Sequence, residues 1–577
     1  MPDDVPERVE PFTKIWRPAE TPGATQELIA AGHPPWLAEL LARRDVEGVE
    51  QAKAFLHPAL DQLHEADSLA DMGQAVARLL TARKSGERVA LVGDYDVDGV
   101  SGTALLTAVL SACGLENEPI LPHRMHEGYG FQPIHAERAQ EKGCSVVVTI
   151  DCGTNSEEAA TRALELGLDV IVTDHHLPSG GGKGRLPDGV ILINPQREDC
   201  GYPYPELSGA GVAFKLASAF AEAAGRPIDA TRLLRIACLG TIADLVPLRD
   251  ENRVIAALGL RALERTTSVG LQALIEVAGV RRPYRTDDVG YRLGPRLNAP
   301  GRLDSADAAL ELILSRDAVR ARQLAQDLDA RNRERQEWER QAATEARDLF
   351  LRRATEGADP LPCILVGWSE TWHRGVVGIA AGRIAKELNR PVLLLAVDGE
   401  SATGSGRSIP GIHLHDFLDR YRDDMERFGG HAQAVGLTVP TAELDGFRQQ
   451  LESAAESWRN RVSTKVYEYE IEFDAADVGS EVLEELQRLE PFGMGNPRPL
   501  VRVRGPLRLT VPPRLFGRGH LSARAQSPDR AKIELLAWGW ADRADRFARP
   551  FEALGFLERD PYRGVVLRIV DVREYRS

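Results

Sequence analysis

Short apolar runs alternate with helix-like segments from about residue 75 onward. The runs at residues 88–92, 145–150 and 170–173 are rich in β-branched residues, and each is followed by a segment typical of a helix. Runs of this kind are characteristic of parallel strands that are buried on both faces of a sheet. The pattern therefore predicts an α/β domain, which we place at residues 46–304.

The pattern changes twice in the middle of the chain. Residues 305–355 contain neither Pro nor Gly and are dense in Ala, Leu, Glu, Arg and Gln, which predicts one or two long helices that connect domains. Residues 356–460 return to α/β alternation, with strands expected near residues 363–366 and 392–397. This second stretch predicts another α/β domain.

The two ends of the chain differ from its middle. Residues 461–577 alternate with period two in several short segments, which predicts a small β-barrel. Residues 1–45 are rich in Pro and charge and are expected to form an extended arm. The expected fold class is therefore α/β, with two α/β domains joined by a long helix and followed by a C-terminal β-barrel.

Composition narrows the class of protein. The chain has 577 residues, 43% hydrophobic and 27% charged, which excludes a disordered chain and allows several independent cores. Six cysteines are scattered along it and none forms a C-x-x-C pair, which argues against a structural zinc site and indicates a reducing, cytoplasmic location. Its apolar runs are too short to cross a bilayer, so we expect no membrane partner.

The charge is unevenly distributed. The formal net charge is −15, which by itself argues against a nucleic-acid partner. Residues 497–577 nevertheless hold 17 Lys and Arg against 9 Asp and Glu, a local net charge of +8, so that the first 496 residues carry −23. An acidic body with a basic C-terminal module is compatible with binding to nucleic acid.

Acidic residues and histidines follow the predicted strands. They are Asp94, Asp96 and Asp98 after the first strand, Asp151 after the second, Asp174, His175 and His176 after the third, and Asp244 after an apolar helical stretch. Because ligands bind at the carboxyl ends of parallel strands, these groups are expected to converge. Crowded carboxylates repel each other unless cations neutralise them. Carboxylates with one imidazole suit Mn²⁺ or Mg²⁺, and a pair of such ions hydrolyses phosphate esters.

Simpler interpretations explain single motifs but not the set. A lone Asp after a strand usually caps a helix or a turn. Asp94, Asp96 and Asp98 are spaced like the start of a calcium loop, but Leu105 stands where that loop needs Glu. Four such motifs in order, each at the end of a predicted element, favour a metal site.

The motifs resemble those of the DHH phosphoesterase superfamily, and further segments narrow the resemblance to its RecJ family of bacterial single-strand-specific 5′→3′ exonucleases. Residues 372–379, 405–408 and 429–436 resemble the DHH-associated domain. Residues 489–497 resemble the segment that leads into the OB-fold of that family. The resemblance covers about residues 75–577 and implies that the C-terminal barrel is an OB-fold.

The resemblance implies roles for the clustered residues. One metal ion is expected on Asp94 or Asp96 with Asp151 as a bridge, and the second on Asp98, Asp151, His175 and Asp244. Asp174 is expected to orient a histidine. His176 is expected either to contact a metal ligand without binding the metal itself or to face a phosphate. Asp151, Asp174, His175 and His176 form the expected catalytic set, with Mn²⁺ or Mg²⁺ as cofactors.

Candidate nucleic-acid contacts lie in five segments. They are Arg124 and Tyr129; Arg296 and Arg302 in an expected Gly/Pro-framed loop; His373; Ser405, Gly406, Arg407 and Ser408; and Gly430 with His431. The segment 405–408 offers N–H groups, hydroxyls and a guanidinium that suit a terminal phosphate, which would hold the 5′ end and set polarity. Arginines of the barrel, at positions 502, 504, 508, 514 and 518, are expected to follow a phosphate backbone.

The acidic cluster and the resemblance together imply a Mn²⁺- or Mg²⁺-dependent exonuclease that degrades single-stranded DNA 5′→3′ to mononucleotides in recombination and repair. We expect a monomer, with a RecQ-type helicase and a single-strand-binding protein as partners. Alternatives are a phosphodiesterase for short oligonucleotides or cyclic dinucleotides, a non-catalytic DNA-binding scaffold, and an inorganic pyrophosphatase. The long connector and the barrel argue against the first, the intact acidic residues with His175 argue against the second, and the basic barrel argues against the third.

Overall fold

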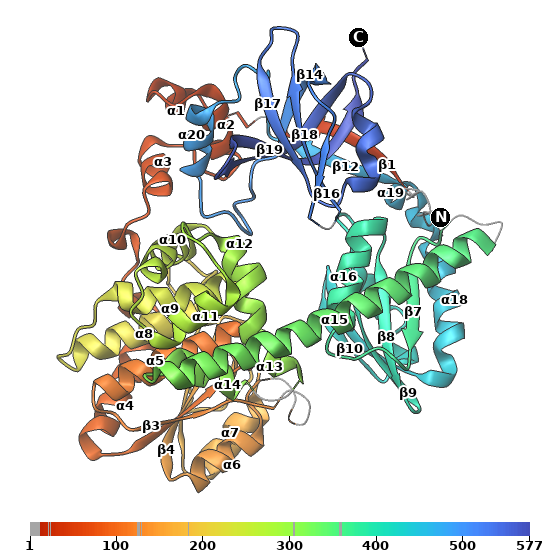
Figure 1. Ribbon diagram of the computed structural model, residues 1–577. Coiled ribbons are helices and arrows are strands. Elements are labelled where there is room, and N and C mark those ends of the chain that lie inside the picture. The colour runs from red at the N-terminus through yellow and green to blue at the C-terminus, as the bar shows by residue number, and fades with distance from the viewer. Residues whose placement is uncertain are drawn as a thin grey trace. The chain divides into compact units, whose positions relative to one another are not determined.

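The structure is a computed structural model that describes residues 12–20, 22–23, 25–123, 127, 130–182, 184–303, 306–356, 361–517 and 519–576. Figure 1 labels the elements of the chain, which divides into two compact units. The larger unit comprises Pro18–Asp329 and Tyr469–Ser577, and the smaller unit comprises Ala330–Glu468 together with the N-terminal segment that ends at Arg17. No helix among the described residues is both long and apolar enough to cross a membrane.

The larger unit contains a parallel five-stranded sheet in the order β3–β2–β4–β5–β6. Its elements are α4 (Met72–Ser85), β2 (Arg88–Gly93), α5 (Val97–Ala112), β3 (Asn117–Ile120), α6 (Pro133–Glu141), β4 (Cys144–Ile150), α7 (Glu157–Glu165), β5 (Asp169–Thr173) and β6 (Ile191–Ile193). Val89 and Leu91 of β2 pack in one core with α4 and α5, whereas Ala90 and Val92 pack in another with α6 and α7. Because both faces are covered, the strands are continuous apolar runs, and the prediction of buried parallel strands is confirmed.

A layer of helices follows the sheet. It comprises α8 (Gly209–Ala223), α9 (Ala230–Ala243), α10 (Asp250–Glu264), α11 (Val269–Ala278), α12 (Thr286–Asp288), the π-helix η3 (Val289–Leu293), α13 (Gly294–Leu303) and α14 (Asp307–Leu314). The Gly/Pro-framed loop expected around Arg296 is wrong, because this segment is α13. Pro295 directly follows the π-helix η3, whose wider turn precedes α13, and Pro300 lies inside α13. Gly301 lets α13 approach the loop after β2 closely, since a Cβ there would lie 2.9 Å from the Tyr95 carbonyl oxygen.

The long helix predicted within residues 305–355 is confirmed. Helix α15 (Ala318–Glu356) has 39 residues, and it follows the shorter α14. It begins in the larger unit and ends in the smaller one, because the division falls between Asp329 and Ala330. The helix thus carries the chain from one unit into the other.

The smaller unit is built on a mixed sheet in the order β10–β11–β9–β8–β7. Its elements are β7 (Leu365–Ser369), α16 (Val377–Leu388), β8 (Val392–Asp398), β9 (Ser401–Arg407), α17 (Leu414–Asp419), η4 (Arg422–Asp424), β10 (Arg427–His431), β11 (Ala434–Pro440), η5 (Thr441–Glu443), α18 (Leu444–Ala454), η6 (Ala455–Trp458) and α19 (Arg459–Val462). A separate two-stranded sheet joins β1 (Thr13–Pro18) to β12 (Thr464–Tyr469). The strand expected at residues 392–397 is confirmed by β8, and β7 begins two residues after the start expected at 363.

The C-terminal region forms the predicted barrel. Its elements are β13 (Ile471–Phe473), α20 (Ser480–Gln487), β14 (Val501–Leu509), β15 (Arg514–Phe516), β16 (His520–Gln526), β17 (Lys532–Ala537), η7 (Ala541–Phe547), β18 (Phe551–Asp560) and β19 (Gly564–Glu574). The strands follow the order β14–β18–β19–β17–β16, and pairing of β14 with β16 closes the ring. Closure removes the exposed sheet edges that an open sheet of these strands would leave.

The extended arm expected at residues 1–45 is wrong for the residues that form helices. This region contains α1 (Gln26–Ala30) and α2 (Pro35–Ala42), which are followed by α3 (Val49–Leu56), η1 (Leu60–Gln62) and η2 (Ala66–Ser68). Leu37, Leu40 and Leu41 have the spacing of one helix face, and they are buried in the same core as Val501 of the barrel. Their apolar contacts therefore outweigh the Pro-rich composition.

Candidate metal centre

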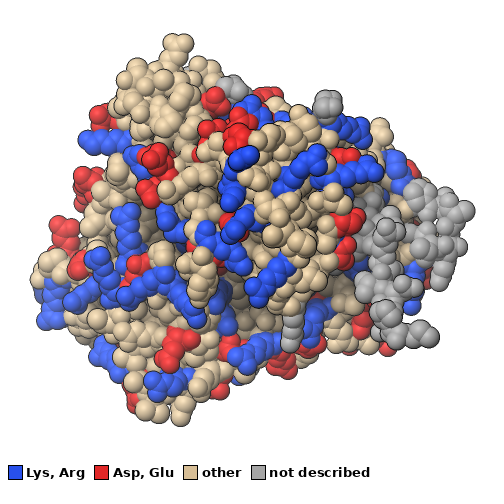
Figure 2. All heavy atoms as spheres, turned by 45° about the horizontal axis from the view of Figure 1, so that its top comes forward, with Lys and Arg blue, Asp and Glu red and all other residues tan. Residues whose placement is uncertain are grey.

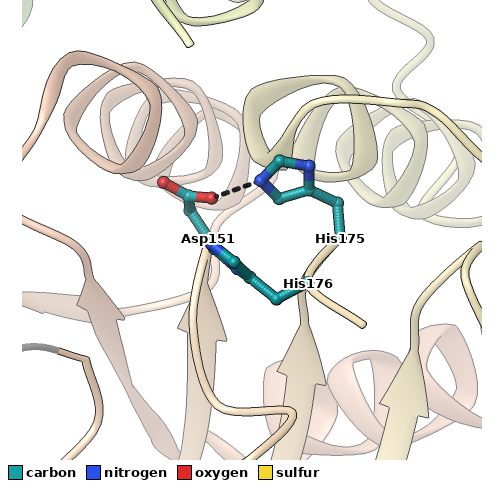
Figure 3. A group of neighbouring side chains, drawn as sticks. All are labelled: Asp151, His175 and His176. Carbon is teal, nitrogen blue, oxygen red and sulfur yellow. Dashed lines mark ion pairs between the residues drawn. The ribbon is translucent and has the colours of Figure 1, made fainter. Parts of the chain in front are cut away.

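The acidic motifs lie where β2, β4 and β5 end, at one edge of the parallel sheet. Figure 3 shows the Asp151 carboxylate and the His175 ring pointing toward each other beyond the tips of the strands. Asp94 and Asp151 are anchored by their backbones, because the Asp94 N–H donates to the Ile150 carbonyl (3.1 Å) and the Asp151 N–H to the Thr173 carbonyl (2.9 Å). Parallel pairing thereby places successive motifs side by side.

Asp98 is buried and held by the start of α8. Its two carboxylate oxygens accept hydrogen bonds from the N–H groups of Gly209 (2.7 Å) and Ala210 (3.0 Å). Gly240 leaves room for this carboxylate, because a Cβ there would lie 2.3 Å from Asp98 Oδ1. Burial and the charges of Asp244 and Asp96 raise the pKa of Asp98 well above its ordinary value, although the two backbone bonds oppose the shift.

Asp96 is a helix cap as well as a member of the cluster. Its Oδ1 accepts hydrogen bonds from the N–H groups of Asp98 (2.9 Å) and Gly99 (3.1 Å) at the first turn of α5. The simple capping interpretation is therefore correct for this residue. The cap fixes the direction of the α5 N-terminus and, with it, the position of Asp98.

Asp151 occupies the centre of the site in a left-handed backbone conformation, with φ of 62°. Its Oδ1 lies 3.1 Å from His175 Nε2, and neither atom has a hydrogen bond with any other described group. Asp244, which caps the C-terminus of α9, places its Oδ2 3.6 Å from the same nitrogen. Burial and four neighbouring aspartates raise the pKa of Asp151 well above its ordinary value, and burial with Asp96 raises that of Asp244 to about 7.

The two histidines have different environments. Asp174 Oδ1 bonds to the Nδ1 of His176 (2.7 Å), while its Oδ2 accepts the Thr154 N–H (2.9 Å), so the histidine that Asp174 orients is His176. Although burial lowers the pKa of His176, the bond to Asp174 raises it to about 9. Burial and the neighbouring His176 lower the pKa of His175 to about 4, although a hydrogen bond with the Leu207 backbone acts to raise it. At neutral pH, His175 is therefore a neutral base and His176 a cation.

The residues present fit bound divalent cations. Three overlapping groups have ligand atoms within 4.8 Å of one another: Asp94, Asp96 and Asp151; Asp98, His175 and Asp244; and Asp151, His175 and His176. Carboxylate oxygens with one imidazole are suitable ligands for Mn²⁺ or Mg²⁺. The buried Asp151 Oδ1 and His175 Nε2, which lack hydrogen bonds to described groups, are the atoms that a cation would satisfy.

Sequence reasoning missed the supports of the cluster. Gly209, Ala210 and Gly240 hold or accommodate Asp98, and Gly209 also abuts Asp151, since a Cβ there would lie 2.5 Å from Asp151 Oδ1. A signal was available in Ser208, which caps α8 by accepting the Gly211 N–H (3.1 Å). A Ser before two glycines at a helix start is typical of a terminus that other groups approach closely.

Comparison with known proteins assigns the family. The chain matches models described as DHH family, N-terminal domain, over residues 88–241; DHHA1 domain, over residues 362–457; and RecJ OB domain, over residues 469–569. The single-stranded-DNA-specific exonuclease RecJ of Salmonella typhimurium is 35% identical over 521 residues, which are 86% of this chain and 88% of that relative. The chain belongs to the RecJ family.

Other RecJ proteins extend the comparison. RecJ of Bacillus subtilis is 37% identical over 473 residues, and the match spans 81% of this chain but only 58% of that longer relative. The crystal structure of Thermus thermophilus RecJ in complex with Mn²⁺ has a TM-score of 0.79 and 30% identity, and the match covers 98% of this chain and 80% of that one. The predicted RecJ architecture of two α/β domains, long helix and OB-fold is thereby confirmed.

The larger unit contains four of the residues that are expected to contact nucleic acid, namely Arg124, Tyr129, Arg296 and Arg302. Arg124, Tyr129 and the side chain of Arg302 lie outside the described residues. Arg296 is described, and its Nη2 pairs with the buried Asp329 Oδ1 (2.7 Å) while its Nη1 donates to the Arg292 carbonyl (2.6 Å). The pair with Asp329 ties α13 to α15.

Arg407 of the smaller unit has no carboxylate partner among the described residues. Its Nη1 donates to Ser405 Oγ (2.6 Å) and to the Gly406 carbonyl (2.8 Å), and burial lowers its pKa. Gly378, at the start of α16, is so close that a Cβ there would lie 3.0 Å from both Arg407 Nη2 and Ser405 Oγ. A half-buried guanidinium beside a helix N-terminus favours an anion. We call Ser405, Arg407 and the start of α16 the Arg407 pocket.

The neighbours of this pocket have structural roles. Ser408 donates its hydroxyl to the Ile412 carbonyl (2.8 Å). Gly430 has φ of +136° in the hairpin of β10 and β11, and a Cβ there would lie 2.4 Å from the Ala434 carbonyl oxygen. His431 is exposed at the end of β10, and strand register aligns it with Ala434 and then with Arg407. Of these three residues, Ser408 is half-buried and His431 is exposed.

Arginines of the RecJ OB domain are largely paired. Arg502 contacts Glu472 (2.6 Å) and Glu552 (2.8 Å), and Arg504 contacts Asp474 (2.7 Å). Figure 2 shows Lys and Arg side chains spread over one face of the molecule, many of them next to Asp or Glu. Arg502 and Arg504, which were expected to follow a phosphate backbone, are thus held by carboxylates, and Arg518 lies outside the described residues.

His373 lies in the smaller unit, where its ring stacks on Trp338 of α15 with centroids 4.7 Å apart. Its Nδ1 accepts the Gly375 N–H (3.0 Å), and burial together with Arg374 lowers its pKa. The motif at residues 372–379 therefore forms the turn that enters α16.

Proposed function

We propose that this chain is a divalent-metal-dependent exonuclease that degrades single-stranded DNA 5′→3′ and releases 5′-mononucleotides. The observation that carries the proposal is the convergence of five aspartates and His175 at one sheet edge, with Asp151 and His175 each shared between two groups of possible ligands. Membership of the RecJ family, whose curated relatives are single-stranded-DNA-specific exonucleases, supports the substrate. We also infer a role in DNA recombination and repair from that family.

For the metal ligands, we propose that Asp94 and Asp96 hold one cation and that Asp98, His175 and Asp244 hold the other, with Asp151 between them. When bound, such cations supply a nucleophile at neutral pH and neutralise charge on the phosphoryl oxygens. The chain's own residues position them: two N–H groups of α8 fix Asp98, and the α5 N-terminus fixes Asp96. We propose that His176, which Asp174 orients through Nδ1, faces the scissile phosphate and donates a hydrogen bond to one of its oxygens.

Replacing each histidine by alanine separates these roles. His176→Ala is expected to lower kcat by about 10²–10³-fold, the usual effect of losing one donor to developing charge, and to leave the Kd for Mn²⁺ nearly unchanged. His175→Ala is expected to weaken Mn²⁺ binding and activity together. Calorimetric titration with Mn²⁺ and steady-state kinetics measure both. Equal loss of Mn²⁺ affinity in the two variants would show that His176 is a ligand.

We propose that the Arg407 pocket binds the terminal 5′-phosphate of the strand and so determines polarity. Arg407→Ala is expected to raise KM for 5′-phosphorylated single strands by about 10–100-fold, because a charge-assisted hydrogen bond contributes about 1.5–3 kcal/mol. KM for strands with a 5′-hydroxyl should change little. The matched control is Arg422→Ala, whose guanidinium pairs with exposed Asp419 in the same unit. An unchanged KM on the phosphorylated strand would refute this assignment.

The test of the main proposal is a pair of assays with Mn²⁺. One substrate is a 5′-phosphorylated single strand labelled at its 3′ end, and the other is the same strand in a blunt duplex. Shortening of the single strand from its 5′ end, with the duplex spared and activity lost in a chelator, is the expected result. Binding without shortening would indicate a DNA-binding scaffold, and cleavage limited to very short oligonucleotides would indicate a small-substrate phosphodiesterase.

We further propose a catalytic domain at residues 46–304, a connecting helix at 305–355, a DHH-associated domain at 356–460 and an OB domain at 461–577. The family matches at residues 88–241, 362–457 and 469–569 support this division.

We also propose a monomeric, cytoplasmic enzyme that receives single strands from a RecQ-type helicase and works beside a single-strand-binding protein. The six free cysteines support a reducing compartment. Size-exclusion chromatography with light scattering tests the monomer.

A further inference from the structure

An aromatic pocket of about 320 Å³ lies in the smaller unit. Its walls are Trp338, Gln341 and Ala342 from α15 and residues 370–373 from the segment before α16. The pocket has a size suited to part of a ligand rather than to a single water. None of these residues belongs to the metal centre or to the Arg407 pocket. Residues 370–373 only precede α16, whose start is part of the Arg407 pocket.

Trp338 stands apart from the other tryptophans of this unit. Trp372 is buried in the core, and Trp368 and Trp458 pack against it, whereas the part of α15 that enters this core begins at Ala342. Trp338 is half-buried, and the ring contact described for it is the stack on His373, with centroids 4.7 Å apart and planes tilted by 30°. An indole that serves no core and lines a pocket is typical of a binding surface.

The pocket is held in shape by hydrogen bonds. Trp372 Nε1 (2.8 Å) and Thr371 Oγ1 (3.1 Å) both donate to Glu345 Oε2 of α15. His373 Nδ1 accepts the Gly375 N–H (3.0 Å), so in the neutral ring the proton lies on Nε2. His373 therefore supports the indole of Trp338 and has one N–H donor left for a ligand. A rigid aromatic platform of this kind binds flat molecules with little loss of entropy.

We propose that this pocket binds one nucleobase of the single strand, stacked on Trp338, with His373 as a positioning residue. The inference rests on the proposed function. A nucleobase fits because each base has a π-face, so stacking tolerates any sequence, as a nuclease without sequence preference requires. Gly378, which abuts Arg407, is five residues after His373, and that stretch of chain spans at most about 18 Å. The stacked base therefore belongs to one of the first few nucleotides from the bound end.

The test measures binding of 5′-phosphorylated single strands by fluorescence anisotropy in a chelator, so that no cleavage occurs. Trp338→Ala is expected to weaken binding about 5–100-fold, the range for loss of one base stack, while Trp338→Phe, which keeps a ring, stays near wild type. Trp458→Phe is the matched control, because Trp458 packs on Phe417 rather than lining the pocket. It should leave binding unchanged.

A scan of the strand identifies the base. An abasic site moved through the first nucleotides should weaken binding by wild-type protein at one position, and that position should have no effect on Trp338→Ala. A 2-aminopurine at the same position should be quenched by wild type and Trp338→Phe but not by Trp338→Ala. The quenching test remains valid even if a variant is unstable, because the proposal requires that wild-type protein by itself quench 2-aminopurine at one position.

Two results would overturn the inference. One is an abasic scan whose profile is the same for wild type and Trp338→Ala, and the other is 2-aminopurine fluorescence that wild type quenches at no position. Failure of the proposed function is distinguishable, because wild-type protein would then leave single strands intact with Mn²⁺. Wild-type shortening together with a flat scan refutes only the stacking site.

Discussion

Asp151→Asn is expected to lower kcat by more than about 10³-fold while the metal-free protein becomes more stable to heat. Asp151 lies at the centre of the cluster and belongs to two of the three groups of possible ligands. Its charge is disfavoured by burial and by Asp98, Asp96, Asp244 and Asp94, which raise its pKa. Asparagine keeps the shape, removes the charge and tolerates the left-handed backbone at this position, where φ is 62°.

Two measurements on the same preparation check this expectation. Exonuclease assays with Mn²⁺ give the loss of activity, and thermal unfolding in a chelator gives the change in Tm. The matched control is Asp229→Asn, at an exposed cap of α9 whose carboxylate accepts the Thr231 N–H (3.0 Å), and it should leave kcat unchanged. Activity within tenfold of wild type, or a large fall in Tm, would contradict the central role of Asp151.

Metal-free protein is expected to lose stability as the pH rises from 5 to 8, and Mn²⁺ is expected to reverse the trend. Asp98, Asp151 and Asp244 have pKa values raised above their ordinary range, that of Asp244 to about 7. A carboxyl whose pKa is higher in the folded than in the unfolded chain contributes stability at low pH. That contribution falls as the pH rises from about 4, where the unfolded chain releases its proton, through the folded pKa.

Cations invert this dependence because they bind the deprotonated ligands. The increase in Tm caused by Mn²⁺ should therefore grow from pH 5 to pH 8, and a cation at 100 times its Kd adds about 2.7 kcal/mol. Scanning calorimetry of the wild type at several pH values measures how Tm changes with pH, once in a chelator and once with Mn²⁺. The Asp151→Asn variant should show a smaller effect of Mn²⁺. A Tm difference that does not change with pH would contradict the proposed ligand set.

Local patterns were sufficient for the elements that carry the site. The apolar runs that became β2, β4 and β5 are continuous because both faces of the sheet are covered, so the strands and the acidic residues after them could be predicted without coordinates. The resemblance to the RecJ family added that the second α/β domain is the DHH-associated domain and that the barrel is an OB-fold. Residues 294–303 and 26–42 were misjudged, because Pro and Gly were taken as signs of loops where packing allows helices.

Contacts between distant segments could not be predicted. Asp98 is fixed by N–H groups that lie more than a hundred residues away in the chain, and Arg296 pairs with Asp329, 33 residues further along the chain. Trp338 lies in a polar helical stretch of the sequence, and it is distinguished from a surface residue by its stack on His373 and by the pocket that it lines. The partner of a side chain depends on how helices and strands pack, and the local spacing of residues does not determine that packing.

The sequence by itself determined the parallel strands, the long helix, the barrel and the clustering of aspartates at strand ends, because each depends on residues close in the chain. The tertiary structure alone decided that His176 rather than His175 pairs with Asp174, that α8 and Gly240 hold Asp98, and that Arg502 is paired while Arg407 has no described carboxylate partner. Burial and hydrogen-bond partners set the charge of each group, and both arise only when the chain is folded.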